Sequence, residues 1–187
     1  FKEDALRMLR AIRFSVVLGF SIEKETAAAI KKYAVLIKRV SAERIREEIE
    51  KILRSENPGG IIKLHELGML QYIIPELEVC FSVAQKNKYH IYNVGDHIIH
   101  AVSATPEDIV IRWAALLHDI GKPLCQSVDA NGTIHFYGHH HESVRLADDI
   151  LHRLKLDNES RKNILLLIEN HDIRIEANSV SVKRVMA

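Results

Sequence analysis

Leu116-Leu117-His118-Asp119-Ile120-Gly121-Lys122-Pro123 is the most informative stretch of this sequence. It follows Arg112-Trp113-Ala114-Ala115, so His118 and Asp119 come where an apolar, helical run ends at Gly121. Adjacent His and Asp side chains leave a helix in different directions. They can still share one metal ion at a helix end, because a carboxylate can bridge. Lys122 adds a positive charge that can bind a phosphate group.

Three more histidines are expected near helix ends. His97 lies on an earlier helix expected over 94–104, while His139 and His171 lie at the start and the end of two later ones. Four helices therefore each offer a ligand. Imidazole and carboxylate ligands suit divalent transition metals and can leave a coordination position for water. Such a metal lowers the pKa of bound water and stabilises charge on a phosphoryl group.

The string 116–123 resembles the signature of HD-domain phosphohydrolases, and His97 has the order and spacing of that family. The resemblance covers about 90–187. It implies a metal-dependent phosphatase or phosphodiesterase, with Mn²⁺, Ni²⁺, Co²⁺ or Mg²⁺ as the metal and a nucleotide or other phosphoester as the substrate. The implied metal ligands are His97, His118, Asp119, His139 and His171. The implied catalytic residues are His118, Asp119 and Lys122.

The same resemblance also implies a missing ligand. The family has a final Asp on a further helix, which we expect beyond Ala187. Asp172 is a poorer substitute for it, so we expect the metal site of this chain to be incomplete.

The N-terminal stretch Glu3-Asp4-Ala5-Leu6-Arg7-Met8-Leu9-Arg10 places an acid and two arginines at three-residue steps. Taken alone, it indicates a helix-surface ion pair of small energy. The stretch resembles the EDxxR motif of bacterial class II tRNA nucleotidyltransferases, which include CCA-adding enzymes and poly(A) polymerases. The resemblance implies that Asp4 and Arg7 hydrogen-bond to the base edge of incoming CTP or ATP. Arg10 belongs to the same implied nucleotide-binding set.

The segment Ser41-Ala42-Glu43-Arg44-Ile45-Arg46-Glu47-Glu48 resembles the ERxxxE segment of that family, whose residues support the helices of the neck. The two resemblances occur in the family's order, neck and then HD domain. They imply a fragment of an enzyme that adds CMP and AMP to the 3′ end of tRNA. We expect a catalytic head, which would use Mg²⁺, to precede Phe1, and tRNA, CTP and ATP to be partners.

Composition limits the class of protein. Of the 187 residues, 47% are hydrophobic, which is enough to form the hydrophobic core of one large or two small domains. No apolar run reaches the length needed to span a membrane. Two distant cysteines indicate a reducing, cytoplasmic location. Residues 1–54 hold 13 Lys and Arg against 8 Asp and Glu, a surface that could face a polyanion. The charge alone, however, favours a solvated helix surface.

We therefore predict an all-α fold, with a helical neck and body segment over 1–80 and an HD-type domain over 81–187 that contains one β-hairpin. Two alternatives remain, a stand-alone HD phosphohydrolase and a non-catalytic tRNA-binding module. Expected details include a helix over 22–37 capped by Ser21, a helix over 106–118 that begins at Pro106, a helix over 159–170 capped by Asn158, and a tight hairpin turn at Asn131-Gly132.

Overall fold

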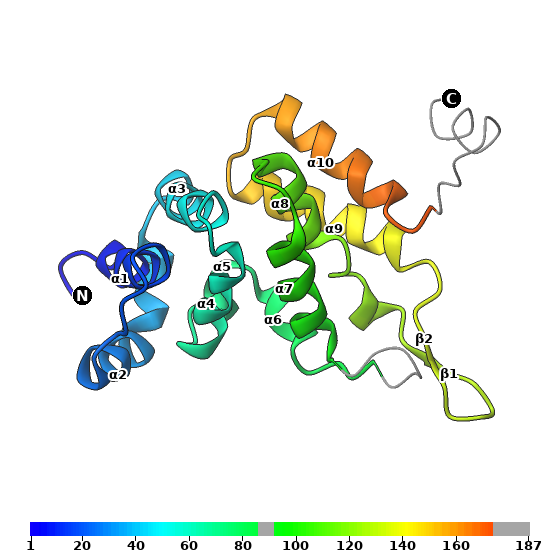
Figure 1. Ribbon diagram of the computed structural model, residues 1–187, viewed down its shortest axis with the longest axis horizontal. Helices are drawn as coiled ribbons and strands as arrows, with labels where there is room; N and C mark the ends of the chain where they lie inside the picture. Colours follow the sequence, from blue (N-terminus) through cyan, green and yellow to red (C-terminus); the bar gives the residue numbers. More distant parts are fainter. Residues whose placement is uncertain (86–91, 174–187) are drawn as a thin grey trace.

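The structure, a computed structural model, describes residues 1–85 and 92–173. It is built from helices and one two-stranded hairpin, which confirms the predicted all-α class (Figure 1). The first helices are α1 (Leu6–Val17), α2 (Lys24–Tyr33), η1 (Ala34–Arg39), α3 (Ala42–Leu53), η2 (Pro58–Ile62), α4 (Lys63–Glu66), α5 (Leu70–Ile73) and α6 (Pro75–Cys80). The later elements are α7 (Val94–Ala104), α8 (Ile109–Leu117), η3 (Lys122–Leu124), β1 (Ser127–Val128), β2 (Ile134–His135), α9 (His139–Arg153) and α10 (Asn158–Asn170).

Helix α3 is the central helix of the N-terminal part and packs on α1. Its residues Ile45, Ile49, Ile52 and Leu53 recur at helical spacing and are all buried, so one face of the helix points into the core. Glu48 is also buried on this helix, and its Oε2 lies 2.6 Å from Nε of Arg13 on α1. This ion pair ties the two helices together.

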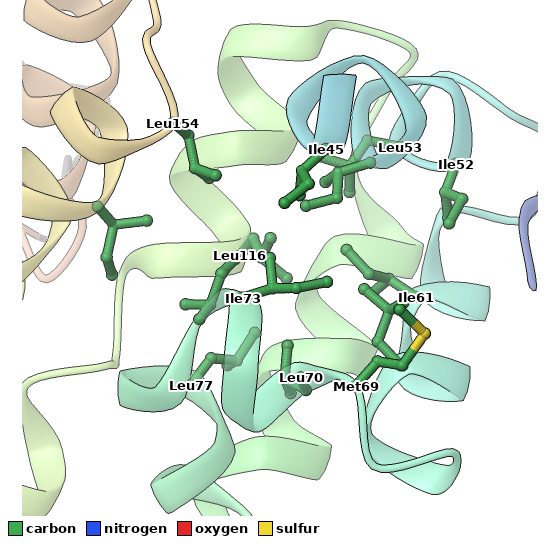
Figure 2. Packing of buried hydrophobic residues seen from close by; sticks show 14 of the residues in the cluster. Ile45, Ile52, Leu53, Ile61, Met69, Leu70, Ile73, Leu77, Leu116 and Leu154 are labelled. Carbon is green, nitrogen blue, oxygen red and sulfur yellow. The ribbon is translucent and has the colours of Figure 1, made fainter. Parts of the chain in front are cut away.

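The hydrophobic core continues from the N-terminal helices into the later ones. Figure 2 shows Ile73 of α5 and Leu116 of α8 within one cluster, which also contains Leu53 of α3 and Leu154. All four side chains are at most 4% exposed. Because α8 carries the His-Asp pair at its end, its packing on the N-terminal helices fixes the position of that pair.

Arg112 joins the same two parts through hydrogen bonds. This buried guanidinium on α8 donates to the carbonyl oxygens of Leu53, of Ser55 at 2.9 Å and of Pro106 at 3.0 Å. Leu53 and Ser55 lie at the end of α3, where carbonyl groups lack partners within the helix. A cation at this end also complements the helix dipole.

Three helix starts differ from the predicted ones. Glu23, not Ser21, caps α2 by accepting from the amides of Glu25 and Thr26. Asp108 caps α8, so Pro106 precedes that helix, and Asp157 rather than Asn158 caps α10. In each case a carboxylate lies within three residues of the expected cap and accepts the free amides of the first turn.

The predicted hairpin is present, with Ser127 opposite His135 and Val128 opposite Ile134. Its turn is wider than a two-residue Asn-Gly turn. The carboxylate of Asp129 accepts from the amides of Asn131 and Thr133, both at 2.9 Å, and Gly132 takes a φ of 78°. Asp129 therefore organises the turn, and the glycine supplies its left-handed residue.

Within the described residues, every helix is too short or too polar to cross a lipid bilayer.

Candidate metal centre

Four helices bring histidines to one buried carboxylate. His118 ends α8, and Asp119 follows it directly; His139 begins α9, and His171 ends α10. His97 lies in the first turns of α7. Helices α7 and α10 both pack on α8, and α9 packs on α10, so the four helix ends converge on one point.

Asp119 is the centre of this cluster, with a side chain that is 2% exposed. Its Oδ2 lies 3.3 Å from Nε2 of His97 and 3.1 Å from Nε2 of His118. Its Oδ1 lies 3.1 Å from Nε2 of His139 and 3.6 Å from Nε2 of His171. Each carboxylate oxygen thus belongs to one trio, and the ligand atoms of each trio lie within 4.8 Å of one another.

The backbone fixes the orientation of three of these rings. Nδ1 of His118 lies 2.8 Å from the carbonyl oxygen of Ala115, Nδ1 of His139 lies 2.8 Å from that of Phe136, and Nδ1 of His171 lies 2.6 Å from that of Ile168. A carbonyl oxygen only accepts, so each Nδ1 must carry the proton. The lone pair of the neutral ring is then on Nε2, which is the arrangement typical of a metal-ligating histidine.

The donor set fits a divalent cation. With Nδ1 protonated, each Nε2 faces a carboxylate that can only accept, so either Nε2 also carries a proton or a metal ion lies between the ring and the carboxylate. The Nε2 atoms of His139 and His171 are themselves only 3.3 Å apart. A cation between the rings and the carboxylate satisfies all of these groups, and imidazole with carboxylate is a ligand set for divalent transition metals.

Lys122 supplies a positive charge at the same carboxylate. Its Nζ lies 2.6 Å from Oδ2 of Asp119, and its side chain is 12% exposed. The ammonium also lies over the ring of Phe136, 5.6 Å from the ring centroid. In this arrangement Lys122 neutralises the oxygen that also faces His97 and His118.

The charge on Asp119 is strongly favoured. Burial alone would raise its pKa, but hydrogen bonds from His118, His139 and His171 outweigh burial and hold the pKa well below the usual range. Burial acts to lower the pKa of His171, yet the contact with Asp119 and the neighbouring Asp172 raise it above its ordinary value. The cluster is thus an anion surrounded by groups that can bind protons or a metal.

Close backbone packing places α9 beside the His-Asp pair. The amide of Gly121 donates to Oγ of the buried Ser143 at 3.0 Å. A Cβ at Gly121 would lie 2.5 Å from the carbonyl oxygen of His139 and 2.5 Å from the amide nitrogen of Ser143. Only glycine permits this approach. Neither the serine nor the role of the glycine could be inferred from the sequence motif.

The rim of the centre is partly open. The His97 side chain is 31% exposed, against 11% for His139. Asp172 lies at the rim on the other side, 3.4 Å from Nε2 of both His139 and His171, and is largely exposed. The second trio thus has an additional carboxylate nearby, although the family resemblance implies that Asp172 is a poorer substitute for a more distant Asp. That expected residue beyond Ala187 lies outside the described residues.

The predicted nucleotide-binding residues lie around α1. Asp4 Oδ1 accepts from the amide of Leu6 at 3.0 Å and lies 4.0 Å from Nη2 of Arg44. Arg7 is exposed on α1, while Nε of Arg10 lies 3.8 Å from the buried Glu48. These residues share one helix and its start, far along the chain from the metal centre.

Four histidines and one aspartate, brought together from the ends of helices, are characteristic of a helical domain that binds metal ions. Residues 88–187 match the HD domain family, and residues 19–81 match a family described as the probable RNA and SrmB-binding site of polymerase A. The chain belongs to the HD domain family, whose matched region is more than half of its length.

The relatives extend the similarity to the whole chain. It is 33% identical to the A-adding tRNA nucleotidyltransferase of Deinococcus radiodurans over 98% of its own length and 45% of that protein. It is 32% identical to the multifunctional CCA proteins of Tolumonas auensis, over 92% of this chain and 44% of that protein, and of Pseudomonas savastanoi, over 91% and 44%. The chain thus spans less than half the length of these relatives. Both family resemblances identified from the sequence are confirmed.

Proposed function

We propose that this chain binds a divalent transition metal at the Asp119 centre and hydrolyses phosphoesters there. The observation that supports this most directly is the placement of four imidazole Nε2 atoms 3.1–3.6 Å from the two oxygens of one buried carboxylate. The ligands are His97, His118, Asp119, His139 and His171, with Asp119 able to bridge two ions. Membership of the HD family supports a divalent metal, and we propose Mn²⁺, Ni²⁺, Co²⁺ or Mg²⁺ as its identity.

The chain's own residues have distinct parts in this reaction. A metal bound here would activate water and stabilise charge on the phosphoryl group. Asp119 and His118 orient the site, and the partly exposed side of His97 leaves a path for the substrate. Lys122 is held on Asp119 by a charged hydrogen bond, so a metal that neutralises the carboxylate would weaken this contact and free the ammonium to contact a phosphate.

Phosphoester hydrolysis with Mn²⁺, Ni²⁺ or Co²⁺ tests this proposal. We expect His118→Ala to lower the rate by at least tenfold, because it removes a ligand whose orientation the backbone fixes. His152→Ala is the matched control, since His152 is exposed on α9 and lies outside the centre. Equal rates for wild type and His118→Ala would reject hydrolysis at this site.

For the whole protein we propose tRNA nucleotidyl transfer from CTP and ATP, with Mg²⁺ at a catalytic head that is not part of this chain. The names of the relatives support this activity, and the matched ranges 19–81 and 88–187 support the division into a neck over 1–80 and a metal-binding domain over 81–187. Asp4, Arg7 and Arg10 are the proposed nucleotide-binding residues. Arg7 is exposed, as contact with a nucleotide requires.

A binding role for the N-terminal region is a second candidate, supported by its match to a probable RNA-binding family and by its excess of Lys and Arg. It predicts that tRNA binds this chain with an affinity that falls steeply as salt rises. Arg7→Ala should weaken this binding, and Arg145→Ala, on the exposed face of α9, should not. Salt-independent binding would contradict an electrostatic RNA interface.

A further inference from the structure

A cavity separate from the metal centre is lined by residues of α3, of α8, and of the connection into α10 and its first turns. Its volume is about 280 Å³, and none of its lining residues belongs to the metal centre. Trp113 lies five residues before His118 on α8, and Ile164 lies seven residues before His171 on α10. At 1.5 Å per residue, these two lining residues lie about 7.5 to 10.5 Å along their helices from the histidines of the metal centre.

The floor of the cavity is apolar and contains a polar group without a partner. Trp113, Ile109, Val110 and Ile164 supply the apolar surface. Trp113 is 1% exposed, and its indole Nε1 has no hydrogen-bond partner among the described residues. The Nε1 atom has almost no accessible surface, so a ligand in the cavity would contact only the apolar part of the Trp113 ring.

Cationic side chains lie at the wall of the cavity on the α3 side. Arg46 Nε and Arg54 Nη2 lie 3.7 and 3.8 Å from the two oxygens of Glu50. Both separations exceed hydrogen-bond length, so Glu50 only loosely engages the two guanidinium groups. Arg46 also donates from Nη1 to the carbonyl oxygen of Lys155. Guanidinium donors therefore remain for an acceptor in the cavity.

The connection between α9 and α10 supplies a third cation. Lys155 has a φ of 60°, a left-handed conformation that non-glycine residues rarely adopt. This conformation caps the end of α9, where the amide of Leu156 donates to the carbonyl oxygen of Leu151 at 3.0 Å. Asp157, the second carboxylate of the wall, already caps α10 by accepting from the amide of Ser160 at 2.8 Å. The cavity is thus lined by three cations, Arg46, Arg54 and Lys155, and by two carboxylates, which leaves its wall with a net positive charge.

We propose that this cavity binds a small phosphate-bearing ligand, of the size of pyrophosphate or a nucleoside monophosphate. Arg54 and Lys155 would contact the phosphate. The apolar floor would cover the non-ionic part of the ligand. A volume near 300 Å³ is at the lower end for ligand pockets, which excludes larger molecules. This site is separate from the metal centre and does not depend on the proposed hydrolysis.

Trp113 is the single tryptophan of the chain and lines this cavity, so its fluorescence can report a ligand that binds there. Inorganic phosphate, pyrophosphate and AMP are titrated into the 187-residue chain with a chelator present and the ionic strength held constant with chloride. The chelator prevents phosphate from binding to a metal at the other site. We expect a saturable change in Trp113 emission with at least one probe, and equilibrium dialysis should give the same affinity.

Two variants link the signal to the cavity. Arg54→Gln should weaken binding about tenfold or more, because a hydrogen bond to a charged group is lost. Lys155→Gly should weaken binding similarly while folding normally, because glycine adopts a positive φ without strain. Lys162→Gln, an exposed cation on α10 outside the cavity, is the control and should bind as wild type does.

Each other outcome would overturn the proposal. If none of the three probes binds, the cavity is not a phosphate site. If a probe binds with an affinity that Arg54→Gln and Lys155→Gly leave unchanged, it binds elsewhere. If tRNA alone changes the Trp113 emission, the cations of this wall belong to an RNA surface and not to a small-ligand site.

Discussion

Replacement of Lys122 by Met is expected to destabilise the metal-free chain and to strengthen its affinity for metal. The ammonium lies 2.6 Å from Oδ2 of Asp119, and the two side chains are only 12% and 2% exposed. Removal of one partner from a buried ion pair costs about 3–5 kcal/mol. The imidazoles around Asp119 can still bind protons, so we expect a loss at the lower end, about 3 kcal/mol. For a chain of this size that is a fall in Tm of about 6–12 °C.

A metal ion changes this result. When a divalent cation neutralises Asp119, the missing ammonium matters less, and we expect the destabilisation to fall to about 1 kcal/mol, the level of an exposed pair. The thermodynamic cycle then requires metal to bind the variant about 2 kcal/mol more tightly, which is about 30-fold in Kd. Phosphoester hydrolysis should nevertheless become slower, because the variant lacks the ammonium that would contact the phosphate.

Urea unfolding with EDTA and with saturating Mn²⁺ measures both free energies, and calorimetric titration measures the metal affinity. Met keeps the length and apolar stem of the side chain, so packing near Phe136 is retained. Lys162→Met, at an exposed position on α10, should change neither quantity by more than about 0.5 kcal/mol. Equal destabilisation of Lys122→Met with and without metal would refute the reasoning.

Three further predictions follow from packing and burial. Arg112→Met should lower the free energy of unfolding by about 3–5 kcal/mol in urea titrations, because three carbonyl oxygens, of which that of Leu53 is in a buried hydrogen bond, lose a charged donor; a change below 1 kcal/mol would show that water replaces it. Gly121→Ala should weaken Mn²⁺ binding by at least tenfold in calorimetric titrations, since the added Cβ would lie 2.5 Å from the carbonyl oxygen of His139; unchanged affinity would mean that α9 shifts without cost. Burial raises the pKa of the Cys80 thiol to about 12, so at pH 8 a thiol reagent should modify Cys125 first and Cys80 only on unfolding, whereas equal rates would contradict the packing.

The same pKa shift gives a pH dependence. The folded chain keeps the Cys80 proton to a pKa of about 12, while the unfolded chain loses it near the ordinary value of 9.0. The stabilisation is therefore fully present below pH 9 and is lost as the pH rises from about 9 to 12. Cys80→Ala should show a smaller loss of stability over this range in urea titrations, and parallel curves for the two proteins would contradict it.

The metal ligands could be predicted from the sequence because the ability to bind a metal depends on residue type, and the sequence gives the residue types directly. His118 and Asp119 follow an apolar helix, and His97, His139 and His171 were placed by family order; the structure brings all five together. The fixed tautomers could not be predicted, since they depend on carbonyl groups three residues earlier at helix ends. The same holds for Ser143, which meets Gly121 only after α9 has packed.

The predicted helices were largely correct, but their starts were not. Asp108 and Asp157 each cap a helix for which a different start was expected, because several residues near a helix start can accept its free amides. The expected helix over 22–37 becomes a 3-10 helix at Ala34, where the buried Ala34 and Ile37 lie three residues apart. The cavity at Trp113 could not be found in the sequence, because it joins residues from α3 to α10.

Metal content after loading with Mn²⁺ and dialysis tests the central claim most directly, when wild type is compared with Asp119→Asn and Asp129→Asn. Asp129 also lies beside a histidine, with Oδ2 3.0 Å from Nε2 of His135, but this pair is exposed on the hairpin and belongs to neither trio. We predict one or two ions per chain in wild type and Asp129→Asn, and close to none in Asp119→Asn. Equal metal content in all three proteins, or none in wild type, would contradict the account.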